Sequence, residues 1–506
     1  MNEVRAHLTV YGCQMNRLDA ELVAERLRRS GACVVDAPDE ANVLLFLTCS
    51  VRAHAEDRLF SNIGALAARR RHEPDLVIGV LGCTAQQFGE GLRRKAPLVD
   101  VVCGPGRLAD LPGLIENARA GRPAVALDAS RHEVGAAGFR AADRALDGLE
   151  LARPLGGPSP GHAYVTAMRG CDNFCAYCVV PQVRGPERSR PPAVVLDEVR
   201  RLVDAGACRV TLLGQAVNKY EADEVGRRWD LADLLAAAAE VPGLPRVEFI
   251  TNHPRHVTER LADVFRDVPA VAPYLHMPVQ AGSDRVLARM KRGYTAAEYE
   301  ERVAMVREAR PDVAVASDFI VGFPGETEND FEATCDLARR VRFSGAFVFK
   351  YSPRPGTYAA AHYADDVPVG EKRRRNQVLL NLVQEVALED NAALVGQRVP
   401  AFVEGPSPRP HLDAEDSCGP AGLPGRGEPA TASRPDKPAG PHARRPGHTR
   451  AGAPGRAGDR LQLRARTPHN RIVVFDGPPD LAGRIVPVRI VRASALTLFG
   501  EQAASA

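Results

Sequence analysis

The chain has 506 residues, enough for about three domains, and 25% of them are charged. Its formal net charge is only +3, so the overall field does not indicate nucleic-acid binding, and any RNA contact would depend on local basic patches. The 11 cysteines are an odd number and the N-terminus lacks a signal peptide's apolar segment, which argues against a secreted disulfide framework. Apolar runs such as residues 43–47 are too short to span a bilayer. We therefore expect a cytoplasmic protein that is not inserted in a membrane.

Residues 1–125 have the pattern of an N-terminal α/β domain. Short apolar runs rich in β-branched residues alternate there with amphipathic stretches of helical period. The runs cover residues 6–11, 42–48 and 76–81, and helices are expected at 17–29 and 53–70. Such alternation predicts a parallel sheet whose strands are joined by crossover helices.

A cysteine follows each of these three strands, namely Cys13, Cys49 and Cys83. In an open α/β sheet ligands bind at the carboxyl ends of the strands, so we expect the three thiols to converge there. Cys103 also ends an apolar run, and it could be a fourth ligand or a small buried residue before a glycine turn. The other cysteines stand alone and are interpreted as structural or incidental: Cys33, Cys208, Cys335 and Cys418.

The middle of the chain begins with a change of composition. Residues 126–157 are rich in Ala, Gly, Arg and Pro with weak apolar periodicity, and we interpret them as a terminal helix or strand that continues into a linker. Apolar runs then alternate with helical segments through residues 158–392. The runs are AYVTAM, RVTLLG, RVEFIT, YLHMPV, VAVASDFIVGF and GAFVFKYS. Six strands with interleaved helices predict an incomplete β/α barrel, with its chemistry at the carboxyl ends of the strands.

The first of these strands is followed by three cysteines in a CxxxCxxC spacing, Cys171, Cys175 and Cys178. Structural zinc sites normally have four ligands, and bacterial ferredoxins use another spacing with a fourth cysteine. Three thiolates suit a cuboidal iron-sulfur cluster with one open iron. The known use of such an open iron is to chelate S-adenosylmethionine for radical chemistry.

The cysteine loop and several other segments together resemble the radical-SAM methylthiotransferases, and within them the MiaB-type branch that acts on tRNA. The matching segments are, in chain order, YGCQMNRLDAE, TCSVRAHAEDR, LGCTAQQ, CDNFCAYCVVPQVRGPERSRP, HMPVQAGSDRVL, SDFIVGFPGET and FKYSPRPGT. They extend over most of residues 1–400 in the order of the family, which makes coincidence negligible.

The resemblance implies two 4Fe-4S clusters and S-adenosylmethionine as cofactors. One cluster would be held by Cys171, Cys175 and Cys178, and the other by Cys13, Cys49 and Cys83, while the family pattern does not require Cys103. Cofactor-lining positions of the family match Tyr177, Gly214, Gln215, Asp318 and Gly322, with Pro278, Gln280 and Glu326 nearby. A core tyrosine and glycines in tight turns remain alternative interpretations of these positions.

The implied activity is conversion of N6-isopentenyladenosine at position 37 of tRNA, next to the anticodon, into its 2-methylthio derivative. No side-chain acid or base can break an aromatic C–H bond at neutral pH, which explains the need for a radical. The resemblance also implies a monomer that receives electrons from a donor such as flavodoxin or ferredoxin. Two alternatives within the enzyme class modify threonylcarbamoyl adenosine in tRNA or an aspartate of a ribosomal protein. A third is an iron-sulfur RNA-binding protein with impaired catalysis.

Three regions are candidates for RNA binding. Arg184, Arg188 and Arg190 follow the cysteine loop and could contact phosphates, support the cofactor pocket or form a solvated basic loop. Residues 372–375 begin a long helix and are equally ambiguous. A small β-barrel of the TRAM kind is implied for residues 393–503, interrupted by a low-complexity stretch at 406–466.

This interruption has almost no β-branched or aromatic residues between positions 410 and 466, so we expect no strand there. It is either a disordered basic insertion or a stretch translated in the wrong reading frame. The second alternative would leave the barrel incomplete. Smaller departures from the family pattern are Ala216 in place of Asn, Gln182 in place of Tyr and Lys291 in place of Asn.

Overall fold

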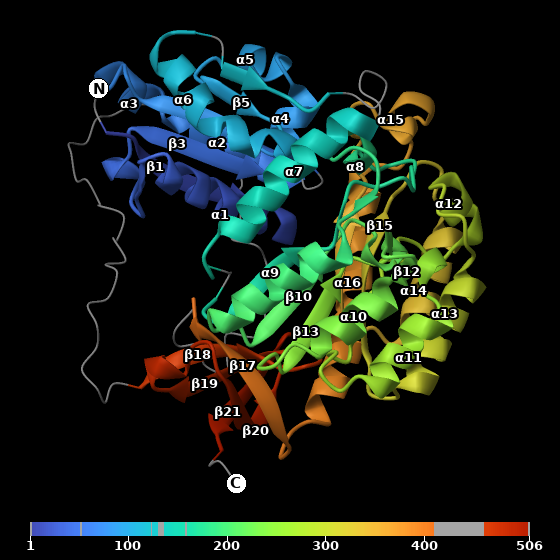
Figure 1. Cartoon of the computed structure of the whole chain (residues 1–506). Coiled ribbons are helices and arrows are strands. Elements are labelled where there is room, and N and C mark those ends of the chain that lie inside the picture. Colours follow the sequence, from blue (N-terminus) through green and yellow to red (C-terminus); the bar gives the residue numbers. More distant parts are fainter. Residues whose placement is uncertain are drawn as a thin grey trace, which may run out of the picture.

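The computed structural model describes residues 3–50, 53–122, 124–129, 136–156, 159–408 and 460–503. Figure 1 shows three units: a sheet with flanking helices at the top, a β/α unit at the right and a small barrel at the bottom. A long helix, α7 (Ala136–Ala152), lies between the first two units. The expected order of an α/β domain, a β/α barrel and a β-barrel is confirmed.

The N-terminal sheet is parallel, with strand order β2-β1-β3-β4-β5-β6. Its strands are β1 (Arg5–Tyr11), β2 (Cys33–Val34), β3 (Val43–Thr48), β4 (Val77–Leu81), β5 (Val101–Cys103) and β6 (Ala124–Ala126). β3 and β4 are buried along their whole length, as expected for central strands covered on both faces. The predicted strands are therefore present, and they pair in parallel.

Helices cover both faces of this sheet. One apolar core joins the sheet to α1 (Gln14–Arg29) and α6 (Leu111–Arg119). A second core joins its other face to α2 (Ala53–Ala65), α4 (Cys83–Phe88) and α5 (Gly91–Lys95). The helix predicted over residues 53–70 is divided at Leu66, after which α3 (Ala67–His72) begins.

Residues 126–157 contain the helix that was one of the two expected elements, and this helix, α7, makes up most of the described part of the stretch. It buries apolar side chains such as Leu146, and acidic side chains occupy another part of the buried face. Asp143, Asp147 and Glu150 are spaced at i, i+4 and i+7, and all three bind arginines of the central unit. Ion pairs therefore add to apolar contacts in packing α7 against the central unit.

The central unit contains the six strands that were predicted. They are β7 (His162–Thr166), β10 (Arg209–Leu213), β13 (Arg246–Ile250), β14 (Tyr274–His276), β15 (Ala314–Val321) and β16 (Gly345–Lys350). β10 pairs in parallel with β7 and β13, and β15 pairs in parallel with β14 and β16. A bridge between Val247 and Val271 lies where the two groups of strands meet. The result is an incomplete β/α barrel, and all carboxyl ends of its strands lie at one end.

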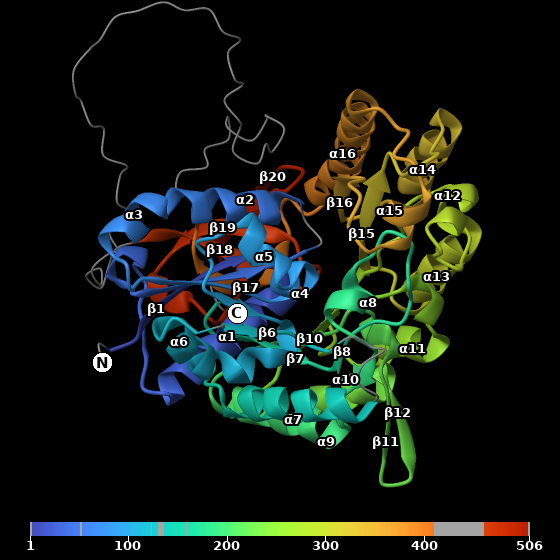
Figure 2. The same cartoon turned by 90° about the horizontal axis from the view of Figure 1, so that it is seen from above.

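Helices α9 (Pro192–Asp204), α10 (Leu231–Ala239), α11 (Glu259–Asp267), α12 (Asp284–Arg289), α13 (Ala296–Ala309), α14 (Glu328–Val341) and α16 (Val369–Ala392) belong to this unit. Figure 2 shows α11 to α14 and α16 along its outer side. Capping boxes begin α13 at Thr295 and α14 at Thr327. Short elements near the strand ends are β8 (Met168–Arg169), α8 (Val180–Val183), β9 (Arg188–Ser189) and α15 (Tyr358–His362).

The C-terminal barrel is closed, with strand order β17-β18-β19-β21-β20. Its strands are β17 (Arg398–Pro406), β18 (Leu461–Arg466), β19 (Ile472–Gly477), β20 (Ile485–Ala493) and β21 (Thr497–Gln502). The expected small β-barrel is therefore confirmed, but one expectation was wrong, because β18 lies in the stretch where no strand was expected. The missed signal is the alternation in LQLRAR, where Leu463 and Ala465 are fully buried between polar or charged neighbours. The rest of the predicted interruption, from 409 to 459, lies outside the described residues.

Among the helices of the described segments, none combines the length and the apolar character needed to cross a membrane.

Candidate functional site

The CxxxCxxC loop leaves the barrel just after β7 and β8, at the carboxyl end of the first strand. Cys171 and Cys175 are buried and Cys178 is partly buried. Burial raises the pKa of the Cys171 thiol to about 11, and it also raises the pKa of Cys178. A proton therefore leaves either thiol readily only if a cation replaces it, which is what iron ligation provides.

The loop is held by groups from distant parts of the barrel. The amide of Ala176, between two of the cysteines, donates to the carbonyl of Met290 at 2.8 Å, and its own carbonyl accepts from the amide of Ala359 at 2.7 Å. Arg292 is buried and donates from Nη1 to Cys175 Sγ at 3.2 Å and from Nη2 to the carbonyl of Pro278 at 2.8 Å. Sequence reasoning missed Arg292, because a buried arginine and a solvated one look alike in a sequence.

Several polar groups surround the loop at the ends of the next strands. Gln215 follows β10, and Asn252 and His253 follow β13. Gln215 Oε1, Asn252 Oδ1 and His253 Nε2 are buried, and none of them has a hydrogen-bond partner among the described residues. Burial lowers the pKa of His253 to about 2, so its ring is neutral. Buried polar groups are normally paired, so these atoms fit a polar ligand such as the amino acid and ribose parts of S-adenosylmethionine.

The remaining predicted cofactor positions lie on the same end of the barrel. The carboxylate of Asp318, on β15, lies 3.2 Å from Nε2 of His276. Tyr177 is partly buried and packs against the central core. Gly322 follows β15 with φ +69°, and a Cβ there would lie 2.3 Å from Cγ of Lys372. Gly214 lies against Met168, where a Cβ would come within 2.7 Å of its Cγ. Turn geometry and packing therefore account for both glycines without a cofactor.

The second group of cysteines lies at the carboxyl edge of the N-terminal sheet. Cys13 follows β1, Cys49 follows β3 and Cys83 follows β4, and these strands are neighbours in the sheet. A hydrogen bond with Cys49 lowers the pKa of the Cys13 thiol to about 6, so the two sulfurs are in contact. Burial raises the pKa of the Cys83 thiol, and the nearby charge of Cys13 raises it further. The structure therefore brings the three thiols together, as predicted from the strand ends.

Buried polar side chains surround this second group. Asn16, Thr48, Ser50 and Thr84 are each within three residues of one of the cysteines, and all are fully buried. Asn16 Nδ2 and the three hydroxyl oxygens lack a hydrogen-bond partner within the part of the chain that the structure describes. Donors of this kind suit the sulfides and thiolates of an iron-sulfur cluster, whose potential depends on such hydrogen bonds.

Cys103 does not join this group. Its thiol is fully buried and donates to the carbonyls of Gly104 at 3.5 Å and Arg107 at 3.4 Å. Among the described residues, no three His, Cys, Asp or Glu side chains are arranged to bind a single metal ion. A 4Fe-4S cluster requires thiolates that are spaced further apart, because each thiolate binds its own iron. The thiols and the surrounding polar atoms at both groups of cysteines fit a ligand set of this kind.

The two groups of cysteines lie next to each other in space. Val179 and Val183, directly after the CxxxCxxC loop, form a small buried cluster with Cys83 of the N-terminal sheet. The next residue, Arg184, donates from Nε to Cys83 Sγ at 3.1 Å. A segment of six residues thus connects a ligand candidate of one group to a ligand candidate of the other.

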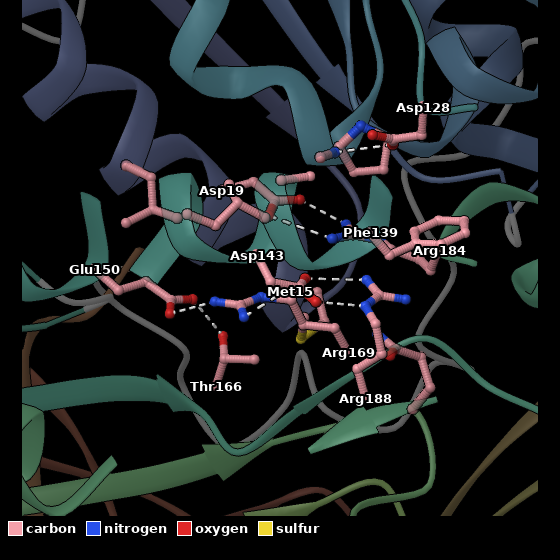
Figure 3. Close-up of a pocket in the computed structure, with 16 residues that line it drawn as sticks. Met15, Asp19, Asp128, Phe139, Asp143, Glu150, Thr166, Arg169, Arg184 and Arg188 are labelled. Atoms are coloured by element: carbon pink, nitrogen blue, oxygen red, sulfur yellow. Dashed lines mark hydrogen bonds and ion pairs between the residues drawn. The ribbon is translucent and has the colours of Figure 1, made fainter. Parts of the chain in front are cut away.

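Ion pairs hold this interface together, and Figure 3 shows part of them around a cavity of about 40 Å³, room for a few waters. Arg169 Nη2 contacts Asp147 at 2.7 Å and Glu150 at 2.6 Å, both on α7. Arg188 Nε contacts Asp143 of α7 at 2.6 Å. The charged face of α7 therefore binds the strand that precedes the cysteine loop and the strand that follows it.

These ion pairs bear on the three alternatives left open for the basic residues after the loop. Arg184 binds Asp19, Arg188 binds Asp143, and Arg190 is almost fully buried against carboxylates of α7 and α9. The solvated-loop alternative is wrong for the same reason. In the helix α16, Lys372 and Arg375 are likewise buried and paired with carboxylates. These side chains support the fold rather than present charge to phosphates.

Glu198 offers a test of the network, since its carboxylate is fully buried between Arg153 at 3.1 Å and Arg190 at 2.7 Å. We expect Glu198→Gln to reduce the free energy of unfolding of the central unit by about 3 kcal/mol, because two buried guanidinium groups lose a partner. Urea denaturation followed by the fluorescence of Trp229, the only tryptophan in the sequence, measures this change.

The control is the neighbouring residue of the same helix. Asp197 pairs with Arg200 at 2.5 Å, but its side chain is 65% exposed. Asp197→Asn should cost less than about 1 kcal/mol, as exposed pairs do. Equal losses in the two variants would contradict a stabilising role for the buried network.

Comparison with known proteins agrees with this arrangement of sites. The model of the radical SAM superfamily matches residues 165–338, and that of Uncharacterized protein family UPF0004 matches residues 5–104. A tRNA-2-methylthio-N(6)-dimethylallyladenosine synthase of Rhodopirellula baltica is 40% identical over 496 residues, with 98% of this chain and 95% of the relative covered. The chain belongs to the family of these synthases.

Further relatives in this synthase family extend over nearly the same length. The synthase of Syntrophotalea carbinolica is 38% identical over 98% of this chain and 99% of its own, and that of Bordetella pertussis is 40% identical over 98% of both. The radical SAM methyltransferase TsrM from Kitasatospora setae has the same fold, with a TM-score of 0.50 and 15% identity over 71% of this chain and 77% of its own. The family inferred from the sequence motifs is thus confirmed, and a radical SAM enzyme uses a 4Fe-4S cluster and S-adenosylmethionine.

The departures from the family pattern have local consequences. Lys291 has φ +57°, a left-handed conformation that Asn adopts more readily than Lys, which explains why Asn is usual there. Its ammonium lies 3.1 Å from the centre of the Tyr358 ring, a contact that Asn would not make. Ala216 is fully buried, and Gln182 bonds the carbonyl of Gly356. None of the three changes removes a thiol from either group of cysteines.

Proposed function

We propose that this protein converts N6-isopentenyladenosine at position 37 of tRNA, next to the anticodon, into 2-methylthio-N6-isopentenyladenosine. One observation carries the proposal: two groups of three cysteines, each at the carboxyl edge of a parallel sheet, pack against each other through residues 179–184. A single cluster would account for radical formation alone. A second cluster beside it accounts for the insertion of sulfur.

Cys171, Cys175 and Cys178 are the proposed ligands of the radical SAM cluster, and the three thiols leave one iron of a 4Fe-4S cluster open. When bound there, the reduced cluster and S-adenosylmethionine supply a deoxyadenosyl radical, which is reactive enough to break the C2–H bond of an adenine ring. Arg292 keeps Cys175 in place through its hydrogen bond to the sulfur. The backbone hydrogen bonds of Ala176 with Met290 and Ala359 hold the loop that would carry the cluster.

Side chains at the neighbouring strand ends would orient the cofactor. Gln215, Asn252 and His253 present buried polar atoms that lack protein partners in the described part of the chain. The contact of Asp318 with His276 fixes the direction of both side chains. Tyr177, one residue before Cys178, is the proposed contact to the adenine of the cofactor.

Cys13, Cys49 and Cys83 are the proposed ligands of a second 4Fe-4S cluster, which provides the sulfur. Asn16 and Thr84 lie beside these thiols with unpaired polar atoms in the described structure, and they can donate hydrogen bonds to cluster sulfur. We further propose tRNA as the macromolecular substrate, a monomeric state, a cytoplasmic location and an electron donor such as flavodoxin or ferredoxin.

The test uses reconstitution under anaerobic conditions followed by analysis of tRNA. The protein should bind about eight irons per chain and form deoxyadenosine when given S-adenosylmethionine and dithionite. Mass spectrometry of tRNA nucleosides from a strain lacking the gene should show N6-isopentenyladenosine without its methylthio derivative. Complementation with this chain should restore the derivative. An unchanged nucleoside profile in the deletion strain would overturn the proposed substrate.

A further inference from the structure

Arg184 occupies an unusual place between the two groups of cysteines. It belongs to the central unit, directly after α8, yet its side chain reaches into the N-terminal unit. Nε donates to Cys83 Sγ at 3.1 Å, while Nη1 and Nη2 contact the carboxylate of Asp19 at 3.3 and 2.5 Å. Asp19 lies on α1, the helix that begins just after Cys13. The guanidinium thus lies between a thiol of one site and the carboxylate beside that site.

The contact between Arg184 and Asp19 is buried. The side chain of Arg184 is 10% exposed and that of Asp19 is 7% exposed. Val179 and Val183 pack against Cys83 on the approach to Arg184. Figure 3 shows Arg184 and Asp19 facing each other across the interface of the two units. Water therefore screens the guanidinium only weakly, and its effect on Cys83 is set by its hydrogen bond to the sulfur and by its ion pair with Asp19.

We propose that Arg184 is a positioning residue that sets the reduction potential of the N-terminal cluster from the opposite unit. The inference rests on the proposed ligand role of Cys13, Cys49 and Cys83. A reduced cluster carries one more negative charge than an oxidised one, so a hydrogen bond and a positive charge at a ligand sulfur stabilise the reduced form. Arg184 raises the midpoint potential, and Asp19 partly offsets this effect.

The position of Arg184 in the chain gives this tuning a function. Residues 179–183 connect it directly to Cys178, a proposed ligand of the radical SAM cluster. The sulfur-providing cluster therefore has the proposed potential only when the two units are docked. A chain whose units separate loses both the hydrogen bond to Cys83 and the positive charge beside it.

The experiment measures the potential of the N-terminal cluster alone. A full-length chain in which Cys171, Cys175 and Cys178 are replaced by Ala retains only the proposed N-terminal site. Reconstituted protein is titrated with dithionite against redox mediators, and the reduced cluster is followed by electron paramagnetic resonance. Arg184→Gln, Arg184→Lys and Asp19→Asn are compared in this background, with iron content measured for each.

Opposite shifts are expected from the two partners. Arg184→Gln removes the positive charge and should lower the midpoint potential, whereas Asp19→Asn removes the negative charge and should raise it. Arg184→Lys keeps the charge, so its potential should lie between those of the wild-type site and Arg184→Gln. Shifts of the same sign in Arg184→Gln and Asp19→Asn, or no shift at full iron content, would overturn the inference.

Arg188→Gln is the matched control. Arg188 is four residues further along, is buried to a similar degree and pairs with Asp143, but in the described residues no bond joins it to a cysteine. It should leave the midpoint potential unchanged. A purely structural role of Arg184 would instead make Arg184→Gln and Arg188→Gln behave alike, with lower iron content and no ordered shift in potential.

The complete enzyme gives a second readout. With all six cysteines present, Arg184→Gln should still form deoxyadenosine, because Arg184 does not touch the CxxxCxxC thiols in the described structure. The methylthio product per deoxyadenosine should fall roughly tenfold or more, the usual loss when a partner of a metal ligand is removed. If the background chain binds no iron, the proposal of a second cluster fails. If it binds about four irons and the potentials do not move, only the role of Arg184 fails.

Discussion

Cys171→Ala is expected to abolish deoxyadenosine formation, whereas Cys83→Ala is expected to preserve it and to abolish the methylthio product. Cys171 belongs to the loop after β7 and Cys83 to the edge of the N-terminal sheet, so the two substitutions remove ligands from different sites. Each variant should retain about four irons per chain instead of eight. Chromatography of deoxyadenosine and mass spectrometry of the tRNA nucleosides measure the two reactions separately.

Cys103→Ala is the control for these variants. Cys103 also ends a strand of the N-terminal sheet and is fully buried, but its thiol bonds backbone carbonyls. Its loss should cost about 1 kcal/mol of stability from the small cavity and should leave both reactions intact. Loss of the methylthio product in Cys103→Ala would show that the N-terminal site has a different set of ligands. Loss of deoxyadenosine in Cys83→Ala would show that the two sites do not act separately.

The second large effect is expected at Gly170, the residue before Cys171. Its φ of +76° lies in the left-handed region, and a Cβ there would come within 1.8 Å of the carbonyl oxygen of Pro186. Because this obstacle is backbone, Gly170→Ala must displace the loop that carries Cys171, whose amide donates to the carbonyl of Gly185 at 3.1 Å. We expect deoxyadenosine formation to fall by about 10²-fold, since a displacement of about 1 Å at a reacting group is enough for such a loss.

Gly206→Ala separates backbone strain from steric conflict. Gly206 has φ +104°, but the nearest described atom to a Cβ there is Cδ2 of Leu155, at 4.0 Å. This variant carries only the conformational cost, about 1 to 2 kcal/mol, and should keep its iron and its activity. Iron analysis and the deoxyadenosine assay compare the two variants. Similar activity in both would mean that the segment at Pro186 moves aside and does not hold the loop.

Much of the architecture follows from local patterns in the sequence. The apolar runs that end in Cys13, Cys49 and Cys83 form neighbouring parallel strands, so their thiols come together at one edge of the sheet. The six runs of the central unit form the strands of the incomplete barrel. These predictions succeeded because strand burial and strand ends are properties of short segments, and parallel pairing then places all carboxyl ends together.

Other features were missed where the signal was short or charged. Strand β18 is a short segment of alternating apolar and polar residues that directly follows a long stretch rich in Pro and Gly. The composition of that stretch predicted no strand. Helix α7 buries carboxylates as well as apolar side chains such as Leu146 and Leu149, so the sequence left open whether this stretch forms a helix or a strand. The core of the closed barrel buries β18, and arginines of the central unit bury the acidic face of α7, so residues distant in the sequence determine the burial of both elements.

The sequence by itself determined the chemistry of this protein: two groups of three thiols, the spacing of one of them, and the family to which the motifs belong. Only the tertiary structure decided how the two groups are related. It brings Arg184 onto Cys83, 101 positions away, and neutralises its charge with Asp19, 165 positions away. A sequence cannot distinguish a buried, paired arginine from a solvated one, because the carboxylate that permits burial comes from a distant element.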